Sequence, residues 1–154
     1  MRLLFVCLGN ICRSPTAEGV MRHKLQLAGL AEQVQVDSCG TAAWHVGKAP
    51  DPRTRAAAEQ RGYRLHDLRA RSLQDDDFAH FDLILAMDHD NLQQLQQLCP
   101  RGATAELDLF LRRGGLAEHE VPDPYYGGAE GFERVLDMVE LACDRLIEQL
   151  REGL

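Results

Sequence analysis

The chain has 154 residues, of which 45% are hydrophobic and 27% charged, and its formal net charge at pH 7 is −7. This size and mixture are typical of one globular domain, so we expect a single domain over residues 1–154. The acidic balance argues against a nucleic-acid partner. Apolar runs are too short to span a bilayer, and Gly9, Asn10 and Arg13 interrupt the N-terminal run too early for a signal peptide. We therefore expect a cytoplasmic protein without membrane association.

The five cysteines contain no Cys-x-x-Cys pair and no set of cysteines and histidines at zinc-ligand spacing. We therefore expect no metal and no cofactor, and thiols that stay reduced.

Apolar patterning and helix signals predict alternating strands and helices along the chain. Strands are expected at residues 2–6, 34–38 and 81–87 and, with mixed polarity, at 105–110. Helices are expected from Pro15 to Gly29 with Ser14 as cap, from Pro52 to Gly62 with Asp51 as cap, after Asp88 through Leu98, and at residues 132–150. A short helix capped by Ser72 is expected toward Phe78, and residues 112–128 are expected to be loop.

This order predicts an α/β fold. We expect a three-layer sandwich in which helices cover both faces of a four-stranded parallel sheet of order 2-1-3-4, the flavodoxin-like arrangement. Ligands of such folds bind at the carboxyl ends of the strands. The segment that follows the first strand is therefore the first place to look for chemistry.

That segment is Cys7-Leu8-Gly9-Asn10-Ile11-Cys12-Arg13-Ser14. A cysteine six residues before an arginine is weak evidence alone, because about half a match is expected by chance. Its position between a strand and a helix is more specific. Gly9 lets the backbone bend close to a ligand, and Asn10 tolerates a left-handed conformation. Such a turn can aim backbone N–H groups at an anion.

Arg13 adds a planar fork that matches two phosphate oxygens. A Cys7 thiol in this positive cup should ionise easily and attack phosphorus, and Ser14 can donate a hydrogen bond to its sulfur. The alternative is that Cys7 is a small buried apolar residue and Arg13 a surface residue. A nucleotide-binding glycine loop is disfavoured, because its glycine spacing is missing.

An acid for the leaving group is the second requirement of this chemistry. The best candidate is Asp123, which lies between two prolines and is followed by Tyr125 and Tyr126. Prolines stiffen the backbone, and the tyrosines offer aromatic surface for a flat substrate ring. An ordinary Asp-Pro turn is the alternative explanation.

Several segments resemble the low-molecular-weight protein-tyrosine phosphatases. Residues 6–15 are similar to the signature loop of that family, and residues 123–126 to its general-acid loop. Residues 38–41, 44–47 and 51–53 resemble its pocket-rim loop. The likeness extends from residue 1 to the final helix.

The resemblance implies hydrolysis of phosphotyrosine in two steps, with a phosphocysteine at Cys7 and no metal. Arg13 and the loop amides of Leu8, Gly9, Asn10, Ile11, Cys12 and Ser14 would bind phosphate, and Asp123 would act as acid and then base. It further implies a bracing network of Asn10, Ser14, Ser38 and His66. Trp44 and Tyr125 would wall the pocket, with Tyr126 as a weaker candidate.

Two loop residues carry finer implications of the resemblance. Ile11 is typical of phosphotyrosine enzymes, whereas relatives acting on phosphoarginine have threonine there. Cys12 would form a reversible disulfide with Cys7 that protects the nucleophile; a passive thiol is the alternative. The implied partner is a phosphotyrosine protein, with a bacterial tyrosine kinase as one option. We expect a monomer or weak dimer, although the residues leave the oligomeric state open.

Two other functions compete with this interpretation. An arsenate reductase can share the fold and loop, but it needs a further pair of redox cysteines in the middle of the chain, where only Cys99 occurs. A phosphotyrosine-binding module without turnover would have lost Cys7, Arg13 or Asp123, and all three are present.

Overall fold

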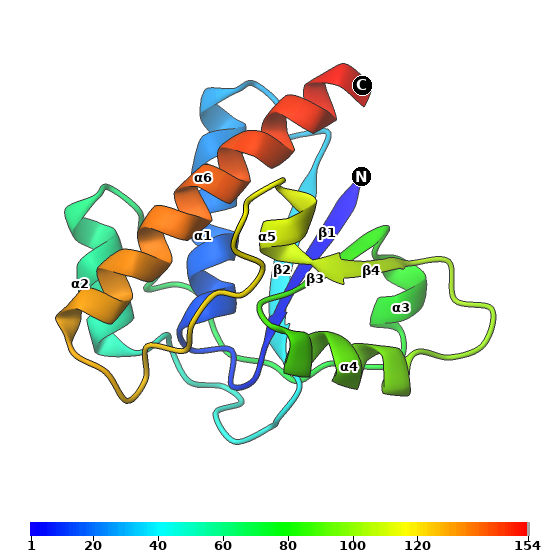
Figure 1. The fold of residues 1–154 in the computed structure, drawn as a ribbon, viewed down its shortest axis with the longest axis horizontal. Helices are drawn as coiled ribbons and strands as arrows, with labels where there is room; N and C mark the ends of the chain where they lie inside the picture. The colour runs from blue at the N-terminus through cyan, green and yellow to red at the C-terminus, as the bar shows by residue number, and fades with distance from the viewer. Residues whose placement is uncertain (154) are drawn as a thin grey trace.

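Four parallel strands form the centre of the molecule in a computed structural model that describes residues 1–153 (Figure 1). The strands are β1 (Arg2–Cys7), β2 (Gln35–Gly40), β3 (Leu83–Ala86) and β4 (Glu106–Leu109). They pair in the order β2-β1-β3-β4, and the last residue of β1, Cys7, lies opposite Gly40 of β2. The predicted strand order 2-1-3-4 is confirmed.

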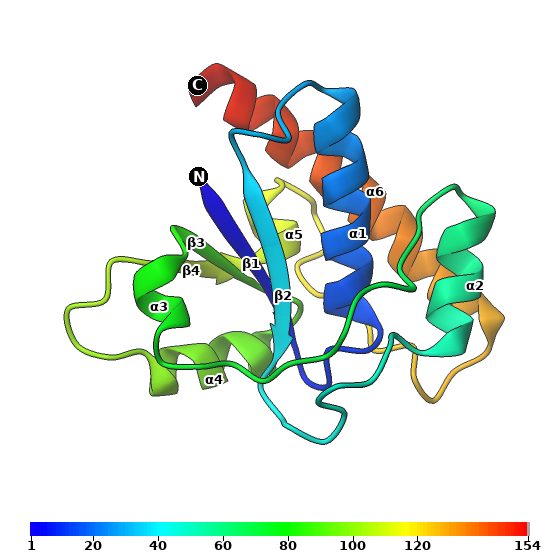
Figure 2. The same ribbon diagram turned by 180° about the vertical axis from the view of Figure 1, so that it is seen from behind.

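Helices cover both faces of this sheet, as predicted (Figures 1 and 2). They are α1 (Arg13–Leu27), α2 (Pro52–Gln60), α3 (Asp77–His80), α4 (His89–Leu98), α5 (Phe110–Arg113) and α6 (Ala129–Gly153). Because side chains alternate along a strand, Phe5 packs with α1, α5 and α6, whereas Leu4 and Val6 pack with α3 and α4. The result is the expected three-layer sandwich.

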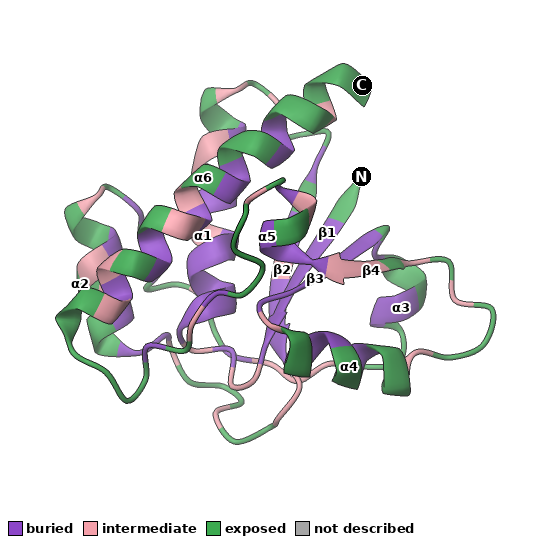
Figure 3. Ribbon diagram, viewed as in Figure 1, coloured by how far each residue is buried: buried purple, intermediate pink, exposed green. Residues whose placement is uncertain are grey.

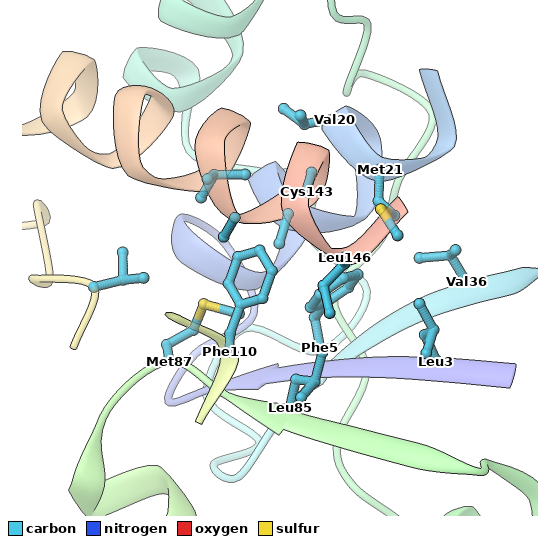
Figure 4. Close-up of a cluster of buried hydrophobic side chains, with 14 of the residues drawn as sticks. Leu3, Phe5, Val20, Met21, Val36, Leu85, Met87, Phe110, Cys143 and Leu146 are labelled. Atoms are coloured by element: carbon cyan, nitrogen blue, oxygen red, sulfur yellow. The ribbon is translucent and has the colours of Figure 1, made fainter. Parts of the chain in front are cut away.

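The larger apolar layer lies between the sheet and α1, α5 and α6 (Figure 4). Phe5 and Phe110 meet edge to face with ring centres 5.0 Å apart. Cys143 and Leu146 of α6 cover them from above, and the outer face of α6 stays exposed (Figure 3). This layer holds α1 rigidly against β1, and α1 begins where the phosphate-loop candidate ends.

Several local predictions were wrong. Helix α1 begins at Arg13, two residues before the expected first helical residue, Pro15, and Cys12 is its N-cap residue without a side-chain cap. Ser14 cannot cap because its hydroxyl is buried and bonded elsewhere. Ser72 pairs with Gly40 in a β-bridge instead of starting a helix. The short helix α5 occupies residues expected to be strand end and loop, and α6 begins at Ala129.

The loops after β1 and β2 lie side by side at the carboxyl edge of the sheet (Figure 2). Gly40 makes this possible, because a Cβ there would come within 2.7 Å of the Leu8 carbonyl oxygen. The segment before Asp123 reaches the same edge, because the Val121 N–H donates to the carbonyl of Met87, the residue after β3, at 2.8 Å. Within residues 1–153, no helix is both long and apolar enough to cross a membrane.

Candidate active site

The loop between β1 and α1 turns its carbonyl groups outward. The carbonyls of Cys7, Leu8 and Ile11 accept backbone N–H groups of Thr41, Ala42 and Asp51 at 3.0, 2.9 and 2.8 Å. In the described chain, the backbone N–H groups of residues 8–12 donate to no other protein group. They remain available to an anion, and the N-terminus of α1 adds its positive end. The predicted anion-binding turn therefore has its donors free.

Asn10 is the centre of the network that braces this loop. It is the single non-glycine residue with positive φ among residues 1–153, at 57°, as its left-handed tendency predicted. Its Nδ2 donates to Ser14 Oγ at 2.8 Å and to Ser38 Oγ at 3.0 Å, and its Oδ1 accepts the Arg71 N–H at 3.0 Å. Three of the four predicted network members therefore meet here.

Ser14 connects the network to the sulfur of Cys7. The two side-chain atoms, Cys7 Sγ and Ser14 Oγ, lie 2.9 Å apart, and both residues are buried. Since Ser14 Oγ already accepts from Asn10, its own proton is free to point at the sulfur. The Ser14 hydroxyl is therefore placed to donate a hydrogen bond to the Cys7 sulfur.

Within residues 1–153, His66 makes no hydrogen bond to Asn10, Ser14 or Ser38, which corrects the prediction that it joins their network. Its ring is about half exposed, at 48%, and lies 3.3 Å from Asp67 and 3.5 Å from the Arg64 guanidinium. Asn10 Oδ1 accepts the Arg71 backbone N–H in its place in the network. Glu18 belongs to the network although no sequence pattern predicted it: its Oε1 accepts the Ser38 hydroxyl at 2.6 Å. Burial raises the pKa of Glu18, although Ser38 and Arg22 oppose this.

Arg13 is held rigidly beside the sulfur. Its side chain is only 4% exposed, and Nη1 donates to Asp88 Oδ2 at 2.6 Å and to the Val121 carbonyl at 3.1 Å. Burial alone would lower the pKa of Arg13, but the charges of Cys7 and Asp88 raise it. Asp88 also caps α4 as predicted, by accepting the Asn91 N–H at 2.8 Å. Its second role, orienting Arg13, gave no sequence signal.

Asp123 lies across the site from the loop, close to Arg13. Its Oδ2 is 3.7 Å from Arg13 Nη2, and its Oδ1 accepts the Tyr125 N–H at 3.1 Å. The carboxylate is about two-fifths exposed, so it can exchange protons with solvent. The structure thus brings Cys7, Arg13 and Asp123 together from segments more than 100 residues apart.

A cavity of about 270 Å³ opens between these groups. Its lining residues are Cys7, Leu8, Gly9, Ile11, Cys12, Arg13, Trp44, His45, Asp123, Tyr125 and Tyr126. Trp44 and Tyr126 stand at the rim, 70% and 93% exposed, and Tyr125 is partly covered. The sequence did not single out His45 as a lining residue. It packs so closely that a Cβ on Gly9 would lie 3.0 Å from its ring.

Cys12 differs from Cys7 in its surroundings. It is buried beside Thr54, and burial raises its pKa to about 12. Cys12 is therefore a neutral thiol at physiological pH, which leaves Cys7 as the loop cysteine placed for attack. Both are free thiols.

The free loop amides and the Arg13 guanidinium are donors of the kind that the three free oxygens of a phosphate ester need, and its phosphorus would then face the Cys7 sulfur. That arrangement defines the class, a cysteine-dependent phosphatase. The family model described as low molecular weight phosphotyrosine protein phosphatase matches residues 2–154. The chain belongs to this family.

Individual relatives agree with that assignment. A low molecular weight protein-tyrosine-phosphatase of Streptomyces coelicolor is 45% identical over 157 residues, which cover 98% of this chain and 94% of the relative. The crystal structure of a protein tyrosine phosphatase from Entamoeba histolytica with Hepes in its active site has a TM-score of 0.93 at 45% identity, covering 99% and 98% of the two chains. A Drosophila arginine phosphatase is also similar, with a TM-score of 0.91 at 32% identity and coverage of 97% and 98%.

Proposed function

We propose that this enzyme hydrolyses phosphotyrosine in proteins through a phosphocysteine at Cys7. The observation that carries the proposal is the meeting of a buried sulfur, an immobilised guanidinium and a carboxylate around one cavity. Phosphoryl transfer needs a positioned nucleophile, electrostatic stabilisation and proton transfer. Cys7, Arg13 and Asp123 are placed to supply these in turn.

In the first step, the Cys7 thiolate attacks phosphorus while the bond from phosphorus to the tyrosine oxygen breaks. Asp123 gives its proton to that oxygen, so tyrosine leaves as a neutral phenol. In the second step, Asp123 takes a proton from water as the water oxygen attacks phosphorus. The bond from sulfur to phosphorus breaks, inorganic phosphate leaves, and the Ser14 hydroxyl stabilises the departing thiolate. Asp123 ends the cycle protonated, as it began.

The aromatic rim supports a phenol as the leaving group. Trp44, Tyr125 and Tyr126 offer flat apolar surface at the mouth of the cavity, where a tyrosine ring would lie. Ile11 also lines the cavity and supports phosphotyrosine over phosphoarginine by the family pattern. Because an arginine phosphatase shares the fold, the rates of hydrolysis of phosphotyrosine and of phosphoarginine should be compared.

The test is hydrolysis of an aryl phosphate without added metal and with a chelator present. We expect vanadate to inhibit and Cys7→Ser to abolish turnover; residual activity in that variant would exclude Cys7 as the nucleophile. Asp123→Ala should slow poor leaving groups more than good ones, by roughly 100-fold for a phenol. Equal losses for both would exclude Asp123 as the acid.

The family match over residues 2–154 supports the prediction of a single phosphatase domain. A phosphoprotein substrate follows from the family. Its identity, the choice of a bacterial tyrosine kinase, the Cys7–Cys12 disulfide, a cytoplasmic location and a monomer or weak dimer stay predictions. A pull-down with Cys7→Ser, which should bind substrate without turning it over, is the experiment that identifies the partner.

A further inference from the structure

Arg53, in the first turn of α2, reaches two aromatic rings from other parts of the chain. Its guanidinium carbon lies 5.4 Å from the centre of the Tyr125 ring and 4.9 Å from the centre of the Phe132 ring. A guanidinium over an aromatic face within about 6 Å is attracted by the ring. Phe132 is buried at the start of α6, whereas Tyr125 lies in the loop that carries Asp123. Arg53 therefore contacts that loop and a fixed point of the fold together.

Asp51 fixes the orientation of this guanidinium. Its carboxylate accepts Arg53 Nε at 3.1 Å and Nη2 at 2.9 Å, and it also accepts the Arg53 backbone N–H at 2.8 Å. These bonds from Arg53 hold the pKa of Asp51 below its ordinary value. The Asp51 N–H in turn donates to the Ile11 carbonyl at 2.8 Å. Arg53 is thereby tied to the phosphate-binding loop on one side and to the acid loop on the other.

Tyr125 connects Arg53 to the acid. Its ring faces Arg53, and its backbone N–H donates to Asp123 Oδ1 at 3.1 Å. A residue with both contacts couples the direction of the carboxylate to the position of the ring. Asp123 is exposed, and among residues 1–153 its one ion-pair partner is Arg13 at 3.7 Å, so the bond from the Tyr125 N–H matters for the direction of the carboxylate.

We propose that Arg53 is a positioning residue: by stacking on Tyr125 it holds Asp123 where it can protonate the leaving oxygen. The inference rests on the proposed role of Asp123 as general acid. Arg53 is not among the residues that line the cavity in the described chain. Its effect should appear in proton transfer and not in phosphate binding.

The test compares Arg53→Met with Arg55→Met, because Met keeps the apolar stem and removes the guanidinium. Arg55 is two residues further along α2 and donates to the Pro50 carbonyl at 3.1 Å, away from both rings. The readout is kcat/KM for a series of aryl phosphates with leaving phenols of rising pKa. For Arg53→Met we expect about a tenfold loss on phenyl phosphate and less than about threefold on a nitrophenyl phosphate. Arg55→Met should retain the leaving-group dependence of the unmodified enzyme.

A purely structural role would slow every substrate equally, and an unchanged leaving-group dependence in Arg53→Met would overturn the proposal. Tyr125→Leu gives a second route. In that background, Arg53→Met should cost less than about twofold on phenyl phosphate, and a full further tenfold loss would also overturn it. If Arg53→Met does not fold, Arg53→Lys serves in its place and should show an intermediate dependence, since it keeps charge without the planar group.

Asp123→Ala in the same substrate series separates the two ideas. If Asp123→Ala leaves the leaving-group dependence unchanged, the proposed acid is wrong. If Asp123→Ala steepens that dependence and Arg53→Met does not, the acid stands and only the role of Arg53 is excluded.

Discussion

Replacing Asn10 tests how the phosphate-binding loop is held in shape. The side chain makes three hydrogen bonds, at 2.8, 3.0 and 3.0 Å, and all of its partners except the Arg71 backbone belong to buried residues. At roughly 1 kcal/mol for each bond, Asn10→Ala should lose about 3 kcal/mol of folding free energy. Because φ at this position is 57°, alanine adds strain of roughly 1–2 kcal/mol.

Asn10→Gly is the matched control for the strain. It removes the same three hydrogen bonds but adopts positive φ without steric cost, and its penalty is an entropic loss of roughly 0.5–1 kcal/mol. We therefore expect both variants to be destabilised by at least about 3 kcal/mol, with alanine worse than glycine by about 0.5–1 kcal/mol. A domain of ordinary stability, about 5–15 kcal/mol, would still fold in both cases.

Urea unfolding followed by circular dichroism measures both differences, provided that the slope with denaturant is unchanged. Turnover of an aryl phosphate should fall by up to about 100-fold in both variants, because the loop amides and sulfur lose their fixed geometry. If either variant remains within about 1 kcal/mol of the unmodified protein, the hydrogen-bond network does not hold the loop, and the reasoning is refuted.

Three further predictions concern neighbouring groups. His66→Ala should change kcat/KM by less than about twofold, because the ring is half exposed and outside the network; a loss comparable with that of Asn10→Ala would restore its predicted role. Cys12, with its pKa raised to about 12 by burial, should resist iodoacetamide at pH 8 in the folded protein and react once guanidinium unfolds it, as peptide mass spectrometry can show. The folded pKa of Glu18 is raised, so the stability that it contributes is present in full below its unfolded pKa and is lost as pH rises through the folded one. Relative to the unmodified protein, Glu18→Gln should therefore gain unfolding free energy as pH rises above the unfolded pKa of glutamate, about 4.3, and urea curves that shift the other way would contradict this.

The sequence predicts the layer architecture because it depends on local signals that repeat. Apolar runs of strand length alternate with capped helices, and that alternation leaves few topologies open. Helix α5 was not predicted, because Phe110-Leu111 continues the apolar pattern of β4 and a single helical turn is too short to show a periodicity. The N-terminus of α1 was misplaced because Ser14 and Pro15 form a good cap signal, which the tertiary bond from Ser14 to the sulfur overrides.

The sequence likewise predicts the part of the site that is local in the chain and not the part that depends on tertiary contacts. Cys7, Gly9, Asn10 and Arg13 lie within one turn of chain, so their spacing carries the information. The contacts that orient them come from distant positions and from backbone groups. No sequence pattern reports that the Arg71 N–H donates to the Asn10 oxygen, and His66 was predicted as a network member from the family resemblance alone.

Asp88 shows why the carboxyl edge of the sheet suits this chemistry. A guanidinium as deeply buried as that of Arg13 needs a charged partner, and Asp88 supplies one from the end of β3, the strand next to β1. The bond uses Nη1 of Arg13 and leaves Nη2 directed toward Asp123. Asp88, at the end of the neighbouring strand, therefore holds the Arg13 guanidinium in place. Nη2 of Arg13 stays on the side of the cavity where a phosphate would lie. Parallel pairing of β1 and β3 places both ends at the same edge, so the sheet topology itself assembles the anion site.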